Sequence, residues 1–132
     1  MSNKLKHDHS TLEGLRILIV DDSSEIRDIL AVILKSSGAV VDTAMDGAEA
    51  IEKANHVKFD VILMDIVMPG LNGKDTAIQI RVLPYTKKII ALSGVIEAKN
   101  IFGELSSPFD AYIMKPVSPV ELSHKILGTM SY

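Results

Sequence analysis

The stretch VILMDIVMPGLNG, residues Val61 to Gly73, places a carboxylate at the end of a strongly apolar run. Its first four residues are of the kind that fills the interior of a sheet, and Asp65 follows them directly. Pro69 and Gly70 then interrupt the pattern, as turn residues do. The stretch predicts a buried strand that carries an acidic side chain at its carboxyl end.

Further apolar, β-branched runs lie on both sides of this stretch. With it they give five predicted strands: Arg16–Val20, Ala39–Thr43, Asp60–Met64, Lys88–Leu92 and Ala111–Met114. Segments with helical spacing lie between the strands. One apolar stripe consists of Ile26, Ile29, Leu30 and Ile33, and another consists of Ala98, Ile101, Phe102 and Leu105.

Capping signals mark two of the helix starts. Asp46 with Glu49 predicts an acidic cap whose partner bonds back, and Ser118 with Glu121 forms a capping box around a proline. Five strands that alternate with five helices predict an α/β fold with a parallel sheet, because parallel neighbours need crossover connections. Helices then cover both faces, and ligands bind beyond the carboxyl ends of the strands.

The composition is that of an ordinary globular domain. The chain has 132 residues, 47% hydrophobic and 23% charged, which suffices for one domain with a full core. Its net charge of −3 provides no basic surface for nucleic acid, and no apolar run approaches the roughly 20 residues that span a bilayer. Without cysteine there is no disulfide or thiolate metal site. We expect a cytoplasmic protein, with a flexible tail or linker over residues 1–13 and no direct contact with nucleic acid or membrane.

Polar side chains follow four of the predicted strands, at the edge where ligands bind. They are Asp21 and Asp22 after the first strand, Asp65 after the third, Ser93 after the fourth and Lys115 after the fifth. Three neighbouring carboxylates repel one another unless a cation lies among them, and oxygen ligands without His or Cys suit Mg²⁺. A hydroxyl and an ammonium group beside them suit a phosphoryl group. The set predicts metal-assisted phosphoryl transfer.

Each of these residues also has a purely structural explanation. Asp21 or Asp22 can cap the helix that follows, and Asp65 can accept backbone hydrogen bonds in the next turn. Ser93 can be an ordinary turn residue, and Lys115 can be a surface lysine. These explanations do not account for the placement of all five residues at strand ends.

Four motifs resemble those of the receiver domains of two-component response regulators, the family that includes the single-domain chemotaxis regulator. They are ILIVDD, VILMDIVMPGLNG, ALSG and YIMKP, in the family's order and at compatible spacings between Leu15 and Leu127. The resemblance implies a receiver domain over residues 14–132, with a doubly wound, flavodoxin-like (βα)5 fold and strand order 2-1-3-4-5. It also implies phosphorelay signalling. A histidine kinase or histidine phosphotransfer protein would donate a phosphoryl group, and the domain would then switch conformation to regulate an output protein.

The resemblance assigns the acidic residues to the phosphoryl acceptor and its metal. Asp65 looks like the phosphoacceptor. Asp21, Asp22, Asp65 and the backbone carbonyl of Val67 would hold Mg²⁺, with Mn²⁺ as a substitute. The metal would neutralise the charge that develops on the transferred oxygens.

The remaining site residues are assigned to the phosphoryl group and the switch. Lys115 and Ser93 would contact the phosphoryl group, and the bond from Lys115 to Pro116 is expected to be cis. Ser93 stands where the family more often has threonine. Tyr112 matches the aromatic switch residue, which turns inward when Ser93 shifts; its structural explanation is a half-buried aromatic on the last strand.

The chain departs from the family pattern beside the site. Val67 and Val95 are apolar where receivers often carry polar groups that place the hydrolytic water, so we expect slow self-dephosphorylation and no other enzyme activity. Pro108 and Phe109 replace the small residues that typically precede the fifth strand, which bears on how freely the neighbouring loop moves.

Other functions fit the sequence less well. A haloacid-dehalogenase-like phosphatase needs a second Asp at the position of Val67, and a dinucleotide-binding domain needs a glycine-rich turn after the first strand. A pseudo-receiver that only binds partners, or a receiver cut from a hybrid histidine kinase, stays open. We expect a monomer or a weak dimer that forms on phosphorylation.

Overall fold

A computed structural model describes residues 11–68, 70–83, 87–94 and 107–130. Its five parallel strands form one sheet in the order β2-β1-β3-β4-β5, as predicted. The strands are β1 (Arg16–Val20), β2 (Val40–Ala44), β3 (Val61–Asp65), β4 (Lys88–Ser93) and β5 (Ala111–Met114). The described helices are α2 (Ser24–Ser36), α3 (Gly47–His56), α4 (Gly73–Arg81) and α6 (Pro119–Met130). The helix expected around residues 98–105 lies outside the described residues.

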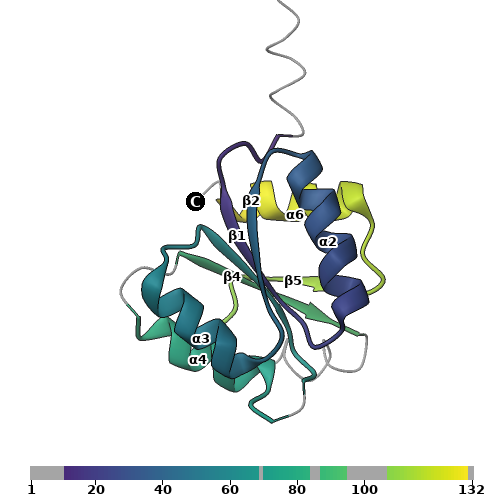
Figure 1. Ribbon diagram of the computed structural model, residues 1–132. Coiled ribbons are helices and arrows are strands. Elements are labelled where there is room, and N and C mark those ends of the chain that lie inside the picture. Colours follow the sequence, from purple (N-terminus) through teal and green to yellow (C-terminus); the bar gives the residue numbers. More distant parts are fainter. Residues whose placement is uncertain (1–10, 69, 84–86, 95–106, 131–132) are drawn as a thin grey trace, which may run out of the picture.

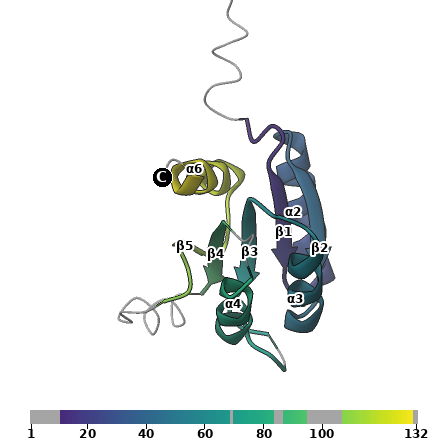
Figure 2. The same ribbon diagram turned by 90° about the vertical axis from the view of Figure 1, so that its left-hand side faces the viewer.

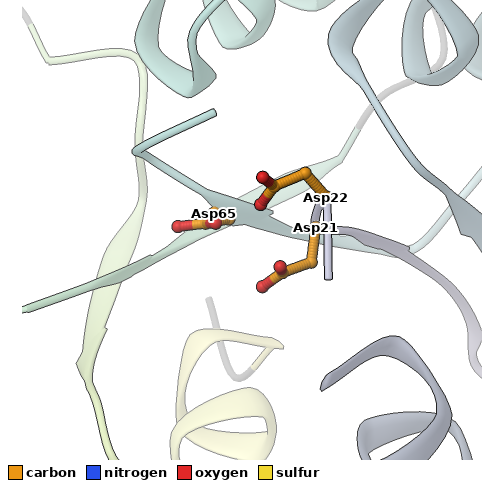
Figure 3. Close-up of side chains that lie close together, drawn as sticks. All are labelled: Asp21, Asp22 and Asp65. Atoms are coloured by element: carbon orange, nitrogen blue, oxygen red, sulfur yellow. The ribbon is translucent and has the colours of Figure 1, made fainter. Parts of the chain in front are cut away.

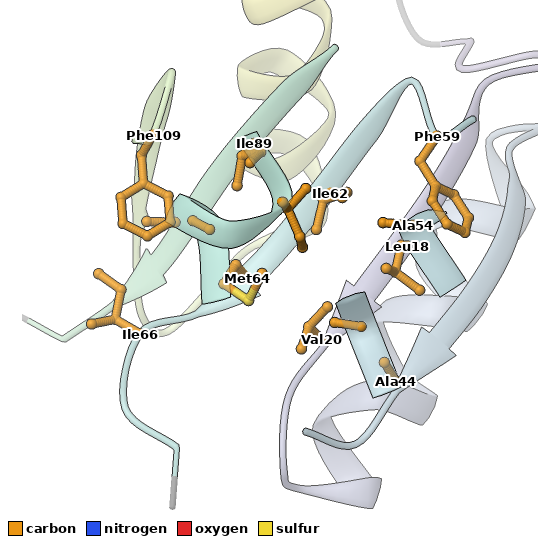
Figure 4. Packing of buried hydrophobic residues seen from close by; sticks show 14 of the residues in the cluster. Leu18, Val20, Ala44, Ala54, Phe59, Ile62, Met64, Ile66, Ile89 and Phe109 are labelled. Atoms are coloured by element: carbon orange, nitrogen blue, oxygen red, sulfur yellow. The ribbon is translucent and has the colours of Figure 1, made fainter. Parts of the chain in front are cut away.

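The helices cover both faces of the sheet. Helices α2 and α6 lie on one face, and α3 and α4 lie on the other (Figures 1 and 2). Successive strand residues point to opposite faces, so the buried residues form two clusters. In β3, for example, Val61 and Leu63 pack in the cluster under α2 and α6, whereas Ile62 and Met64 pack under α3 and α4. Figure 4 shows the second of these clusters. Every residue of β3 is buried, which explains its uninterrupted apolar sequence.

Three strands differ by one residue from their predicted bounds. Strand β2 begins and ends one residue later than expected, as does β3, and β4 extends to Ser93. The pairing between β3 and β4 explains two of these differences. Asp65 is in register with Leu92, and the Ile66 N–H donates to the Leu92 carbonyl at 3.1 Å. The neighbouring strand thus keeps Asp65 in the extended backbone, as the last residue of β3 instead of the first residue of a loop.

Three residues of the predicted stripe on α2 pack against the core: Leu30 is buried, and Ile26 and Ile33 are partly buried. Leu30 and Leu34 are the buried residues of this helix, and Ile29 is 58% exposed. The line through Leu30 and Leu34 has the i, i+4 spacing that follows one side of a helix, and Ile29 lies on the flank of that line. The predicted stripe therefore included one residue too far toward solvent.

The capping signals are largely confirmed. Asp46 caps α3 by accepting the Glu49 N–H at 2.8 Å, and Ser118 accepts the Glu121 N–H at 3.1 Å before α6. The return bond at α3 differs from the prediction, because the Glu49 carboxylate accepts the N–H of Met45, one residue before the cap.

The folded part begins before residue 14, where the sequence placed its boundary. Leu12 is 1% exposed and packs in the cluster under α2 and α6. Its N–H donates to the Ser37 carbonyl at 2.7 Å, at the end of α2. The tail predicted over residues 1–13 therefore includes a core residue. The sequence does not indicate that Leu12 is buried, because a single leucine among polar residues gives no periodic pattern.

Among the described helices, none combines the length and the apolar character needed to cross a bilayer.

Replacing Leu12 with alanine is expected to destabilise the domain by about 2–5 kcal/mol, the usual cost of removing a buried leucine side chain. Chemical unfolding with urea measures the change. Val32→Ala is the matched control, because Val32 is 67% exposed on α2 and should cost no more than about 0.5 kcal/mol. Equal stabilities of the two variants would show that residue 12 lies outside the core.

Candidate functional site

The sequence-predicted site residues lie at the carboxyl edge of the sheet. Asp21 and Asp22 follow β1, whose Val20 is in register with Met64 of the adjacent β3. Asp65 is therefore next to the end of β1. Ser93 ends β4, and the Lys115 N–H after β5 donates to its carbonyl at 2.8 Å. The strand order thus brings residues that are far apart in the sequence to one edge.

The three aspartates form one acidic cluster. Each of Asp21, Asp22 and Asp65 offers a carboxylate oxygen within 4.8 Å of the others, and Figure 3 shows the three side chains around a common space. Asp21 and Asp65 are buried, at 1% and 4% exposure, whereas Asp22 is exposed. The arrangement is open on one side, which suits a metal that keeps part of its water shell.

Neither Asp21 nor Asp22 caps helix α2, so the structural explanation of these residues is wrong. Ser23 is the cap, and its hydroxyl accepts the Ile26 N–H at 3.3 Å. Asp21 instead accepts the Ser23 N–H through Oδ1 at 3.0 Å, and Arg27 donates to the Asp21 carbonyl at 2.6 Å. These bonds fix Asp21 and leave Oδ2 for other partners. Sequence reasoning missed Ser23 and Arg27, although a serine ahead of a helical stripe is itself a cap signal.

Lys115 provides the positive charge of the site. Its Nζ lies 3.2 Å from Asp65 Oδ1 and 3.7 Å from Asp21 Oδ2, and its side chain is 31% exposed. Lys115 is therefore an ion-pair partner of the acidic cluster and not a solvated surface lysine. The peptide bond from Lys115 to Pro116 is cis, as the resemblance implied.

Two buried oxygen atoms test whether the site suits a cation and a phosphoryl group. Asp21 Oδ2 and Ser93 Oγ have no hydrogen-bond partner within the described ranges. Buried polar atoms are normally paired, so unpaired ones require an explanation. A carboxylate oxygen is a ligand for Mg²⁺, and a hydroxyl is a donor for a phosphoryl oxygen. The donor set therefore fits both groups.

The electrostatics of the cluster are visible at Asp65. Burial raises the pKa of its carboxyl group above the ordinary value of 3.8, and the negative charge of Asp21 raises it further. Lys115 and the Val67 N–H lower the pKa and offset part of this effect. The net upward direction means that the negative charge of Asp65 is not fully compensated by the protein alone.

The segment after Asp65 packs tightly against the end of β3. The Val67 N–H donates to Asp65 Oδ1 at 3.2 Å, so Asp65 does accept a turn hydrogen bond in addition to its ion pair. Gly73, which sequence reasoning overlooked, donates its N–H to the Ile66 carbonyl at 3.0 Å. A Cβ on Gly73 would lie 2.2 Å from the Asp65 carbonyl oxygen, so only glycine allows this approach. The Val67 side chain is 57% exposed beside the site.

Tyr112 and Val95 are the other two residues that the sequence placed at the site. Tyr112 is half-buried on β5, in register with Ala91, and its hydroxyl forms a hydrogen bond with Ser107. Val95 lies outside the described residues. Phe109, one of the departures from the family pattern, is buried against the core cluster under α3 and α4.

Residues 17–127 match the model of the response regulator receiver domain. The chain belongs to this family. The match covers both the acidic cluster and Lys115, and the receiver fold is that of a signalling module. The phosphatase and dinucleotide-binding alternatives are not favoured.

Curated and solved relatives of this receiver domain agree with the match. The transcriptional regulatory protein ResD of Bacillus subtilis is 37% identical over 107 residues, which are 81% of this chain and 44% of ResD. A CheY-like receiver domain protein from Methanospirillum hungatei superimposes with a TM-score of 0.81 at 34% identity, covering 89% of this chain and 94% of that one.

A third relative has been solved with a metal. The receiver domain of the sensor histidine kinase PA1611 from Pseudomonas aeruginosa has magnesium coordinated in its active-site cleft. It has a TM-score of 0.77 at 26% identity and covers 90% of this chain and 99% of that one. Receiver domains thus bind Mg²⁺ at an acidic cluster of the kind seen here. The chain spans about half the length of ResD and of the MtrA regulators that it also matches.

Replacing Asp65 with asparagine is expected to stabilise the domain at neutral pH in buffer without Mg²⁺. Because the pKa of Asp65 is raised in the folded state, the ionised carboxylate favours unfolding at any pH above that raised value. As the pH falls through the raised pKa, the wild-type group takes up a proton and the advantage of the variant should shrink.

Thermal unfolding from about pH 8 to about pH 4, across the titration of carboxyl groups, measures this difference. Asp28→Asn is the matched control, because Asp28 is exposed on α2 outside the cluster. An unfolding temperature of Asp65→Asn at or below that of the wild type at neutral pH would contradict the electrostatic account.

Proposed function

We propose that this receiver domain accepts a phosphoryl group on Asp65 from a phosphohistidine of a histidine kinase or a histidine phosphotransfer protein. The observation that carries the proposal is the ion pair of Lys115 with Asp65, at 3.2 Å, inside the cluster formed with Asp21 and Asp22. A phosphoryl group bound together with Mg²⁺ fits this combination of charges, because its oxygens accept from an ammonium group and carboxylates hold the cation. The resemblance in sequence supplies the identity of the donor.

The proposed transfer exchanges a P–N bond of the donor for an O–P bond on Asp65. A carboxylate oxygen of Asp65 attacks phosphorus, the new O–P bond forms as the P–N bond to the donor histidine breaks, and the imidazole keeps the electron pair and takes a proton from solvent. Mg²⁺, or Mn²⁺ in its place, neutralises charge on the transferred oxygens when it is bound. Asp21, Asp22, Asp65 and the Val67 carbonyl would hold it, and the magnesium in the PA1611 receiver supports this assignment.

Lys115 and Ser93 are proposed to hold the product. The Lys115 ammonium group is already within 3.2 Å of Asp65 Oδ1, so a small shift brings it to a phosphoryl oxygen. The Ser93 hydroxyl is buried and has an unused donor in the described structure. Hydrogen bonds to charged groups contribute about 1.5–3 kcal/mol each, and roughly 5.5 kcal/mol moves a two-state domain from mostly inactive to mostly active. The Ser93 contact would be new and the Lys115 contact would be exchanged for an existing one, so the two together supply only part of the free energy of the switch.

The output of the switch is a partner protein. The curated relatives ResD and MtrA are a transcriptional regulator and a DNA-binding response regulator, and their chains are about twice as long as this one. The PA1611 receiver belongs to a sensor histidine kinase, which keeps the hybrid-kinase alternative as a second candidate. We propose that this domain regulates its target by protein contact, as a monomer or as a weak dimer formed on phosphorylation, in the cytoplasm.

Incubation with acetyl phosphate and Mg²⁺ is expected to add the mass of one phosphoryl group to the intact chain. Asp65→Asn should add nothing, and Asp28→Asn, which alters an exposed acid on α2, should behave as the wild type does. Intact-protein mass spectrometry measures the gain. No gain in the wild type would leave a pseudo-receiver, and an equal gain in Asp65→Asn would place the phosphoryl group elsewhere.

Val67 is expected to give the phosphorylated domain a long lifetime. Its side chain is 57% exposed beside Asp65 and cannot hydrogen-bond the water that hydrolyses the acyl phosphate. Val67→Asn supplies an amide there and should shorten the lifetime several-fold, as measured by loss of the phosphoryl mass with time. Val120→Asn is the control, because Val120 is also exposed but lies on α6. A Val67→Asn lifetime equal to or longer than that of the wild type would count against this role.

A further inference from the structure

The segment of residues 107–110, just before β5, holds the side chain of Tyr112. The hydroxyl groups of Ser107 and Tyr112 lie 2.5 Å apart and share a hydrogen bond. Ser107 Oγ also accepts the N–H of Phe109 at 3.2 Å, which fixes the direction of the serine side chain. The Tyr112 hydroxyl is therefore bound by a residue whose own orientation is set by the backbone.

The ring of Tyr112 is held as well. Its centroid lies 5.8 Å from that of Phe109, with the two planes at 63°, an edge-to-face contact. Phe109 is 7% exposed and packs in the same core cluster as Ile66, Met64 and Ile89 (Figure 4). The aromatic contact thus joins Tyr112 to the core.

Helix α4 anchors the 107–110 segment. Arg81, the last residue of α4, donates through Nε to the Pro108 carbonyl at 2.8 Å and forms an ion pair with Asp110. The Asp110 carboxylate also accepts the Ile89 N–H at 2.8 Å. The other end of α4 begins at Gly73, against the Asp65 carbonyl. The segment that holds Tyr112 and the segment that follows the phosphoacceptor are therefore attached to opposite ends of one helix.

We propose that Ser107 is a positioning residue that keeps Tyr112 in its resting orientation, with Arg81 as the anchor of the 107–110 segment. Switching then requires the hydrogen bond between Ser107 and Tyr112 to break, so this bond opposes activation. Coupling between two sites is reciprocal. If phosphorylation of Asp65 moves Tyr112, then releasing Tyr112 from Ser107 favours the phosphorylated state. The regulatory part of this inference rests on the proposed phosphorylation of Asp65, whereas the positioning of Tyr112 does not.

Fluorine NMR on the full chain tests the positioning directly. The probe is 3-fluorotyrosine, in a background with Tyr85→Phe and Tyr132→Phe so that Tyr112 gives the only signal. Ser107→Ala is expected to raise the population of chains in which Tyr112 has left its resting orientation. The increase should be between about two- and tenfold, the effect of losing one neutral hydrogen bond. Ser107→Thr keeps the hydroxyl and should restore the wild-type spectrum. Ser36→Ala, which removes a hydroxyl bonded to Val32 at the far end of α2, should change nothing.

A double-mutant cycle tests the same bond without the label. Ser107→Ala and Tyr112→Phe each remove one partner, so their effects on the unfolding free energy should be clearly less than additive in the double variant. Additive effects, or a fluorine spectrum of Ser107→Ala identical to that of the wild type, would overturn the positioning role.

Equilibrium binding of beryllofluoride with Mg²⁺, in which beryllofluoride stands in for the phosphoryl group on Asp65, tests the regulatory part. Ser107→Ala should bind it between about two- and tenfold more tightly than the wild type, and Ser107→Thr should match the wild type. If Tyr112 moves in Ser107→Ala but the affinity does not change, the regulatory part is wrong. If Tyr112 moves and neither protein is ever phosphorylated, the positioning role stands and the proposed function fails.

Discussion

Repulsion between carboxylates at the ends of two adjacent strands is the constraint on which the site depends. Asp21 and Asp65 are both buried, and water screens their charges poorly. The neighbouring groups are arranged to reduce this repulsion. Lys115 pairs with both residues, and the N–H groups of Ser23 and Val67 each donate to one carboxylate. The pKa of Asp65 nevertheless remains raised, so the protein's own groups do not fully offset the burial of this carboxylate and its repulsion by Asp21.

The fold makes this arrangement possible because it brings distant parts of the chain to one edge of the sheet. Parallel strands end at the same edge, and β1 lies beside β3, so residues 21, 22 and 65 meet without a dedicated loop. The close approach of Gly73 to the Asp65 carbonyl then lets α4 begin directly beside the site. Helix α4 thus begins beside Asp65, and its far end contacts the segment that holds Tyr112.

Much of the fold and of the site could be predicted from local patterns. The predicted bounds of each strand agree with the observed bounds to within one residue, because short β-branched apolar runs are typical of buried strands. The polar residues at the strand ends could be assigned to the site because ligands bind at the carboxyl ends of parallel strands. Contacts of single side chains that belong to no repeating pattern could not be predicted. Leu12 is a core residue only because the end of α2 lies beside it, and Ser107 matters only because Tyr112 faces it. At α2, Ser23 is the cap, in place of the aspartate that the structural explanation required, and Asp21 accepts the Ser23 N–H.

The aspartates at the ends of β1 and β3 are expected to form one site for a divalent cation. Isothermal titration calorimetry with Mg²⁺ measures this binding, and Asp22→Asn is the decisive variant. Asp22 is exposed, so its replacement should leave the fold intact. We predict one Mg²⁺ per wild-type chain and a loss of most of the affinity in Asp22→Asn. Binding of equal affinity in the two proteins, or no binding to the wild type, would contradict the account.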